Sequence, residues 1–61
     1  MRFQDAKKLH NEDEVIDKKT GESIKVLSIE VHSNPNGWSY VVIQGIGDCQ
    51  GYSAWYHDDV K

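Results

Sequence analysis

A thiol, an imidazole and a carboxylate occur near the end of this 61-residue sequence, as Cys49, His57 and Asp58. Together these side chains could act as a nucleophile, a general base and the group that orients the base. Their spacing matches no catalytic signature, and Cys49 lies in the glycine-rich stretch "GIGDCQG", where no helix terminus is evident to stabilise a thiolate. The sequence therefore predicts an incidental thiol in a protein that is not an enzyme.

Histidine and aspartate side chains could also bind a metal ion, and the candidates are His32, His57, Asp58 and Asp59. No pair of them has a spacing that is standard for metal ligands in proteins. The carboxylates of a terminal "HDD" are explained more simply as acceptors of backbone N–H groups in a turn. We therefore predict no metal site and no cofactor.

Acidic residues are concentrated at Glu12, Asp13, Glu14 and Asp17. We expect this run to be exposed, where it could attract a basic partner or protect a strand edge from pairing. The whole chain has 10 acidic and 7 basic residues, which gives a net charge of −3. A general nucleic-acid-binding protein relies on clustered lysine and arginine, so this balance argues against that class.

Aromatic residues are the most informative candidates for binding. Those that share a face of adjacent strands stand about 5 Å apart and can form a cluster. Tyrosine and tryptophan are enriched at binding hot spots, and so small a domain cannot enclose all of them. We predict that part of this group binds a protein partner; the alternative is that it builds the core, with polar tips at the rim. The group consists of Trp38, Tyr40, Tyr52, Trp55 and Tyr56.

Exposed aromatic rings can also stack on nucleic-acid bases, but that use requires basic residues beside them. The segments that carry the aromatic group contain no lysine or arginine. The nearest basic cluster, Lys18, Lys19 and Lys25, belongs to an earlier part of the chain. A single-stranded nucleic acid is therefore not the partner we expect.

Length and composition predict one small domain over residues 1–61. The apolar content of 38% and charged content of 28% are those of a globular chain and not of a disordered one. A single cysteine cannot form an internal disulfide, which favours a reducing compartment. The longest apolar run is "VVI", and the first ten residues have no apolar core of a signal peptide, so we expect a cytoplasmic protein with no membrane segment.

The first half of the chain predicts a short helix and two strands. Residues 3–9 place apolar side chains three apart, which suits two helical turns that dock on the core. A short strand is expected at 13–17, followed by a glycine turn and a long strand at 22–32. In that strand the apolar parity changes between Val26 and Leu27. A β-bulge at this point would let one strand bend and serve both halves of a small barrel.

The second half predicts two further strands and a possible third. "HSNPNG" is dense in turn formers, and a strand follows at 38–44 with apolar residues of both parities. Residues 45–51 contain three glycines and are expected to form a turn before a strand at 52–57. The last residues, 58–61, suit one turn and a very short fifth strand.

These elements predict a mainly β protein, a small SH3-like five-stranded barrel with a short N-terminal helix. An OB-fold normally needs a longer chain. The alternative that remains is an open α+β sheet with the N-terminal helix on one face.

The order of a "FxxAKxL" helix, "DEVID", a lysine-rich glycine turn, "VLSIEV" and a terminal "WYHDDVK" resembles a group of small proteins. These are SH3-like barrels of phages and prophages from Gram-positive bacteria, mostly of unassigned function. The likeness covers nearly the whole chain, although its motifs are structural. Such sequences usually have glycine before the "DEV" strand, where this chain has Glu12. We expect Asn11 to supply the left-handed backbone conformation instead.

A weaker resemblance, carried by "DEV", a glycine and "VLSIE", is to KOW-type and Tudor-like barrels, which often contact RNA or ribosomal proteins. The "ALYDY" segment of signalling SH3 domains is absent, so no polyproline groove is inferred. Two hypotheses follow. The first is a non-catalytic protein-interaction module of phage or prophage origin, monomeric or weakly dimeric. The second is a KOW-like domain associated with RNA or the ribosome.

Overall fold

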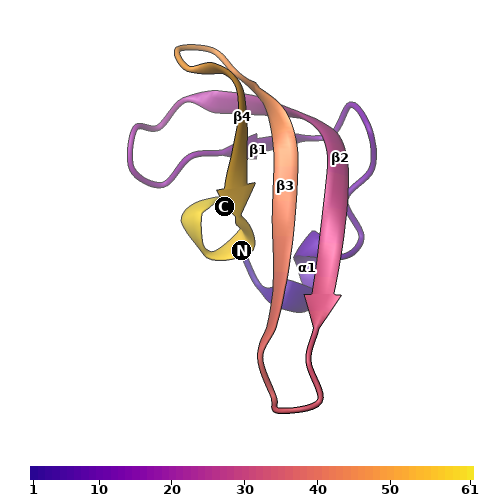
Figure 1. Cartoon of the computed structure of the whole chain (residues 1–61). Helices are drawn as coiled ribbons and strands as arrows, with labels where there is room; N and C mark the ends of the chain where they lie inside the picture. The colour runs from indigo at the N-terminus through magenta and orange to yellow at the C-terminus, as the bar shows by residue number, and fades with distance from the viewer.

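Four antiparallel strands form one sheet of order β1-β2-β3-β4 in a computed structural model that describes residues 1–61 (Figure 1). The mainly β class is thereby confirmed, and each strand pairs with its neighbour in sequence. Two helical segments flank the sheet: α1, Phe3–Ala6, and the 3₁₀ turn η1, His57–Asp59. The strands are β1 (Glu14–Ile16), β2 (Ser23–Ser33), β3 (Ser39–Gly47) and β4 (Gly51–Tyr56).

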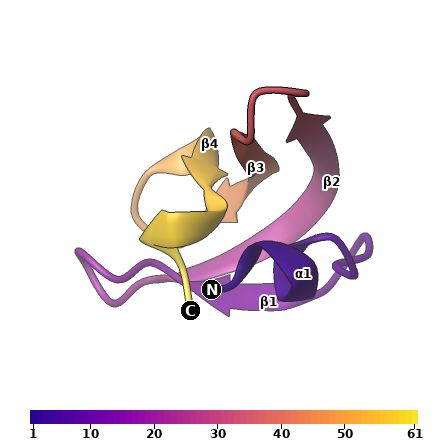
Figure 2. The same cartoon turned by 90° about the horizontal axis from the view of Figure 1, so that it is seen from below.

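The β-bulge predicted in the long strand is confirmed. Val26 pairs with Gly45 of β3, whereas Ser28 pairs with Gln44, so Leu27 is the extra residue between them. The insertion reverses which parity of β2 faces the core, as the slip in the apolar pattern requires. In Figure 2 β2 curves from its contact with β1 to its contact with β3.

Beside the bulge, β3 runs through two glycines that the sequence assigned to a turn. The predicted strand end at Gln44 is wrong, because β3 continues to Gly47 and only Asp48–Gln50 form the turn. Close approach of the chains explains the glycines. A Cβ on Gly45 would lie 2.5 Å from the carbonyl oxygen of Lys25.

The core lies on the concave side of the sheet, where α1 and η1 cover it (Figure 2). Val15, Ile24 and Val41 are buried in this core, and Ile29 packs against it while partly exposed. The N-terminal helix is shorter than predicted: α1 ends at Ala6, and a turn follows. The buried apolar set is Ala6, Val15, Ile24, Val26, Val41, Ile43, Trp55 and Val60.

At the end of the chain, the predicted fifth strand is reduced to an isolated bridge between Val60 and Asp17. The backbone groups of Ile16 and Lys61 also exchange two hydrogen bonds, of 3.0 and 2.9 Å. These contacts cover the outer edge of β1. No strand covers the corresponding edge of β4.

The turn before β1 corrects a further expectation. Glu12, and not Asn11, adopts the left-handed conformation, with φ of 79°. Its backbone N–H donates to the carbonyl oxygen of Val26 at 2.8 Å, next to the bulge. Glycine adopts this conformation readily, whereas Glu12 carries a Cβ.

Candidate functional site

The convex side of β2, β3 and β4 is a sheet surface that neither α1 nor η1 covers (Figures 1 and 2). Side chains reach it at alternate positions of each strand, and the register aligns them in rows across the three strands. We call this surface the outer face. Its members are Lys25, Ser28, Glu30, His32, Tyr40, Val42, Gln44, Ile46, Tyr52, Ala54 and Tyr56.

Three rings make contact across the outer face. The imidazole of His32 stacks on Tyr40, with centroids 4.7 Å apart and planes at 12°. Tyr40 in turn meets Tyr56 edge to face, at 5.8 Å and 75°. Such geometries are favourable for aromatic pairs. The contacts link β2, β3 and β4 and hold the rings in a defined arrangement.

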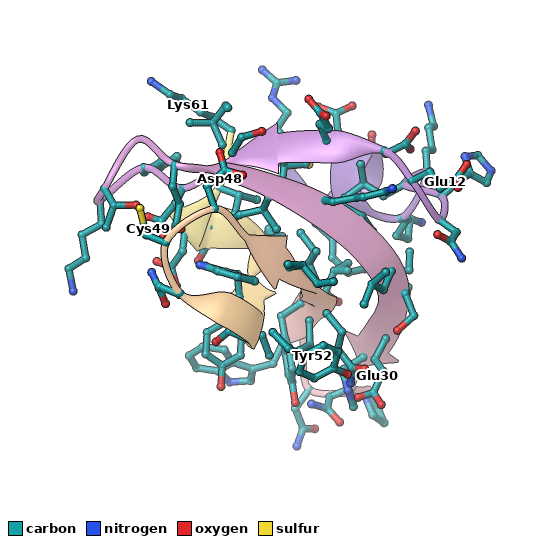
Figure 3. The ribbon with its side chains drawn as sticks, turned by 90° about the horizontal axis from the view of Figure 1, so that it is seen from above. Glu12, Glu30, Asp48, Cys49, Tyr52 and Lys61 are labelled. Atoms are coloured by element: carbon teal, nitrogen blue, oxygen red, sulfur yellow. The ribbon has the colours of Figure 1, made fainter.

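A group of three hydrogen-bonded polar side chains lies on the outer face toward the β3–β4 turn. The phenol of Tyr52 donates to Oε1 of Gln44 at 3.2 Å, and the hydroxyl of Ser28 donates to the same oxygen at 3.3 Å. Figure 3 shows Tyr52 and Glu30 on the same side of the sheet, opposite the side from which Lys61 projects. The face therefore combines aromatic area with a few oriented polar groups.

Several large apolar side chains of this region are open to solvent. Tyr52 is 66% exposed and Tyr56 57%, while Ile46 is also exposed. Trp38, in the hairpin just before β3, is 75% exposed. Exposed aromatic residues gathered on one surface are typical of interaction sites.

Trp55 does not belong to the outer face. It is 7% exposed, and its indole N–H donates to Oδ2 of Asp17 at 2.9 Å. The predicted binding group is therefore divided: one tryptophan is part of the core, while the other four members lie on the outer face or at its hairpin.

Charge is sparse on the outer face. Glu30 lies there beside His32, with its Oε2 3.4 Å from the imidazole Nε2. Lys25, at the far end of the same surface, is paired in register with Ile46. The two lysines of the β1–β2 turn, Lys18 and Lys19, line a pocket of about 530 Å³ that borders the outer face at Ala54. Asp17 and Trp55 also line it.

Asp17 corrects the expectation of an exposed acidic run, because it is only 4% exposed. The backbone N–H of Lys19, at 2.7 Å, and the indole of Trp55 donate to its carboxylate. These hydrogen bonds hold the pKa of Asp17 below its ordinary value. The hydrogen bond from Lys19 makes the largest contribution. Glu12, Asp13 and Glu14 are exposed as predicted.

Glu22 is a second buried carboxylate and lies next to Asp17. The backbone N–H of Cys49 donates to its Oε2 at 2.8 Å, and Gln50 donates from both its backbone and its side-chain amide. The pKa of Glu22 is lowered, chiefly by the Cys49 N–H. The ionised carboxylates of Asp17 and Glu22 therefore connect parts of the chain through their hydrogen bonds. Because several donors already bind them, they are poorly placed to exchange a proton with a substrate.

The structure separates Cys49 from His57 and Asp58, the two residues with which it could have formed a nucleophilic site. Cys49 lies exposed in the turn before β4 (Figure 3), whereas His57 follows the end of that strand. A six-residue strand spans roughly 20 Å. Nδ1 of His57 accepts the backbone N–H of Val41 at 3.1 Å, and its Nε2 lies 2.9 Å from Oδ1 of Asp58. The imidazole thus has a structural role at the rim of the core.

No three His, Cys, Asp or Glu side chains come together in a way that could hold a metal ion. Neither helical segment has the length and apolar character needed to cross a membrane.

Sequence reasoning proposed only Tyr40, Tyr52 and Tyr56 among the members of the outer face and missed the others, which include His32, Val42, Gln44 and Ile46. The signal was present, because Tyr40, Val42, Gln44 and Ile46 alternate with buried residues along β3. This alternation was obscured because Val41 and Ile43, on the buried side of β3, are apolar as well. Gly45 and Gly47 also suggested that the strand ended earlier than it does. His32 had been considered only as a metal ligand.

Comparison of the chain with protein-family models, with curated proteins and with solved structures finds no match. The geometry of the outer face is therefore the basis of the function proposed below.

Proposed function

We propose that this chain is a non-catalytic protein-interaction module that binds its partner through the outer face. The observation that carries the proposal is the exposure of Tyr52 and Tyr56 on an uncovered sheet surface whose rings are already ordered by their contacts. Ordered rings lose little conformational entropy on binding, which favours affinity. A partner that covers these rings would remove a large apolar area from water.

The fold that we propose for the module is the SH3-like barrel, with Val60 and Lys61 as its fifth strand. The bulge at Leu27 bends β2 toward both halves of the domain, and η1 leads into the final residues. The bridge to Asp17 and the two hydrogen bonds with Ile16 support this assignment. The resemblance to phage barrels supports it as well, and on that resemblance we propose a phage or prophage origin and action in the host cytoplasm.

A protein surface is a better partner for the outer face than RNA. Phosphate binding needs clustered lysine or arginine beside the stacking rings. The register instead puts the acidic Glu30 in the row of Tyr56, and a single lysine, Lys25, in the row of Tyr52. Lys18 and Lys19 lie in the β1–β2 turn and approach the outer face only at Ala54, through the pocket that they line with it. We expect a partner surface that is largely apolar, with donors for the phenol oxygens and Glu30.

The test is a double variant, Tyr52→Ser with Tyr56→Ser, compared with the wild type in affinity capture from host lysate and then in calorimetric titration of the purified partner. We expect binding to weaken by at least about thirtyfold, as for the loss of hot-spot residues. The free energy of unfolding should change by no more than about 1 kcal/mol, because both side chains are exposed.

Gln4→Ala provides the control, since Gln4 is exposed on α1, away from the outer face. It should bind as the wild type does. Equal affinity of the double variant and the wild type would contradict the proposal. Binding that weakens steeply with salt would indicate phosphate contacts instead, and would favour the KOW-like alternative.

A further inference from the structure

The two edge strands of the sheet differ in whether a further segment of the chain pairs with them. The edge of β1 is covered by the bridge from Val60 and the hydrogen bonds of Lys61, whereas β4 pairs only with β3. Along β4 the chain leaves space unfilled: the pocket of about 530 Å³ and a smaller apolar hollow of about 200 Å³ both include Ala54 and Trp55. One edge strand is therefore open to a further strand.

The sequence of β4, "GYSAWY", has none of the features that usually protect an edge. It contains no lysine, no other charged residue and no proline, and its register with β3 runs without a bulge from Gly51 to Tyr56. Proteins commonly use such features to prevent pairing between sheet edges. An unprotected edge that is rich in aromatic residues favours strand addition.

The side chains of β4 are also complementary to those of a second β4. In an antiparallel pair with its two-fold axis at Ala54, Tyr52 would face Tyr56 of the second copy, and the same pair would recur on the other side of the axis. The two alanines would meet at the centre, where small side chains let the strands approach. Cross-strand aromatic pairs are favourable, and the two strands, which contain no charged residue, would oppose no like charges within the pair.

We propose that β4 is a self-association edge, which pairs antiparallel with β4 of a second copy about Ala54 and joins the two sheets. The outer faces of both copies would then form one continuous aromatic surface. Since a six-residue strand buries less than the roughly 800 Å² per partner of a standard interface, the dimer is weak and depends on concentration. The inference uses the edge of the sheet and does not rest on the proposed partner site.

Sedimentation equilibrium of the full chain up to millimolar concentration tests this assignment, with reducing agent present to prevent disulfides through Cys49. We expect the wild type to dimerise. Ala54→Lys should raise the dissociation constant by at least about tenfold, because the two charges would face each other across the axis. Ala54 is exposed, so the monomer should keep its circular dichroism spectrum and melting temperature.

A charge swap makes the test specific to the proposed register. Ala54→Asp alone should raise the dissociation constant as Ala54→Lys does. An equimolar mixture of Ala54→Asp and Ala54→Lys should recover the dimer. Ser33→Lys adds the same charge at an exposed site at the end of β2 and should dimerise as the wild type does. A wild type that stays monomeric throughout, or an Ala54→Lys variant that dimerises unchanged, would overturn the proposal.

Discussion

The left-handed backbone of Glu12 connects the N-terminal turn to β1 at the point where β2 bends. A residue with a Cβ pays about 1–2 kcal/mol for this conformation, whereas glycine adopts it readily. The N–H of Glu12 is held by the carbonyl of Val26, so the turn cannot relax without losing that hydrogen bond. The hydrogen bond to Val26 therefore holds the backbone of Glu12 in its strained conformation and fixes the turn beside the bulge.

We predict that Glu12→Gly raises the free energy of unfolding by about 0.5–1 kcal/mol, because relief of strain exceeds the added freedom of the unfolded chain. Urea denaturation followed by tryptophan fluorescence measures the change. Glu12→Ala removes the same charge but keeps the Cβ, so it should give no such gain. An equal gain from both variants would assign the effect to charge repulsion in the acidic run.

Single residues also show what the sequence could reveal about the site. Tyr56 and Trp55 are neighbours with similar chemistry, yet one is 57% exposed and the other 7%. Their alternation along β4 predicts opposite faces, but it does not say which face is the core. That choice depends on Asp17, whose carboxylate binds the indole from 38 positions earlier in the chain. A contact of such range leaves no local pattern.

At the scale of elements, the bulge of β2 and the glycines of β3 form one structural unit. The extra residue at Leu27 brings the backbone of Lys25 against Gly45, where no Cβ can fit without displacing the chain. The bend of the long strand thus depends on a glycine in its neighbour.

We therefore predict that Gly45→Ala lowers the free energy of unfolding by about 1–3 kcal/mol, as overpacking of a tight site does. The new Cβ would lie 2.5 Å from a backbone oxygen, which cannot rotate away as a side chain could. Thermal and urea unfolding provide the measurement. Ser53→Ala, at the position paired with Gly45 on β4, should have a much smaller effect. A fully stable Gly45→Ala would mean that the two strands separate easily.

The same unit explains which elements could be predicted. The parity slip at Val26 and Leu27 identified the bulge, because a buried face leaves a period of two. The length of β3 could not be predicted, since glycine usually weakens strands and Gly45 is explained only by a neighbour distant in sequence. A very short fifth strand was expected from the position of the last residues in the chain, but Val60 forms only an isolated bridge.

At the scale of the whole molecule, two buried carboxylates join parts of the chain that are far apart in sequence. Asp17 binds Trp55 of β4, and Glu22 binds the backbone of Cys49 and Gln50 in the β3–β4 turn. Both pKa values are lowered in the folded protein by these hydrogen bonds. Their stabilising effect is therefore complete above the ordinary pKa values, 3.8 for Asp17 and 4.5 for Glu22.

We predict a loss of stability as the pH falls below those ordinary values and through the lowered ones, because protonation of the folded state abolishes the charged acceptors. Glu22→Gln should be less stable than the wild type near neutral pH and should lose less stability in acid. Urea midpoints measured across this range test both statements. Glu14→Gln, at an exposed site, should leave the acid response unchanged. An acid response of Glu22→Gln equal to that of the wild type would contradict this role.

The two ends of the chain lie close together, since the amino group of Met1 donates to the carbonyl oxygen of Val60. Figure 2 shows both ends on the side of the domain away from the convex surface of β3 and β4. A tag or surface anchor joined at either end would therefore orient the molecule in the same way. Tyr52 and Tyr56 would then point into solution, so the immobilised protein would expose them to a dissolved binding partner.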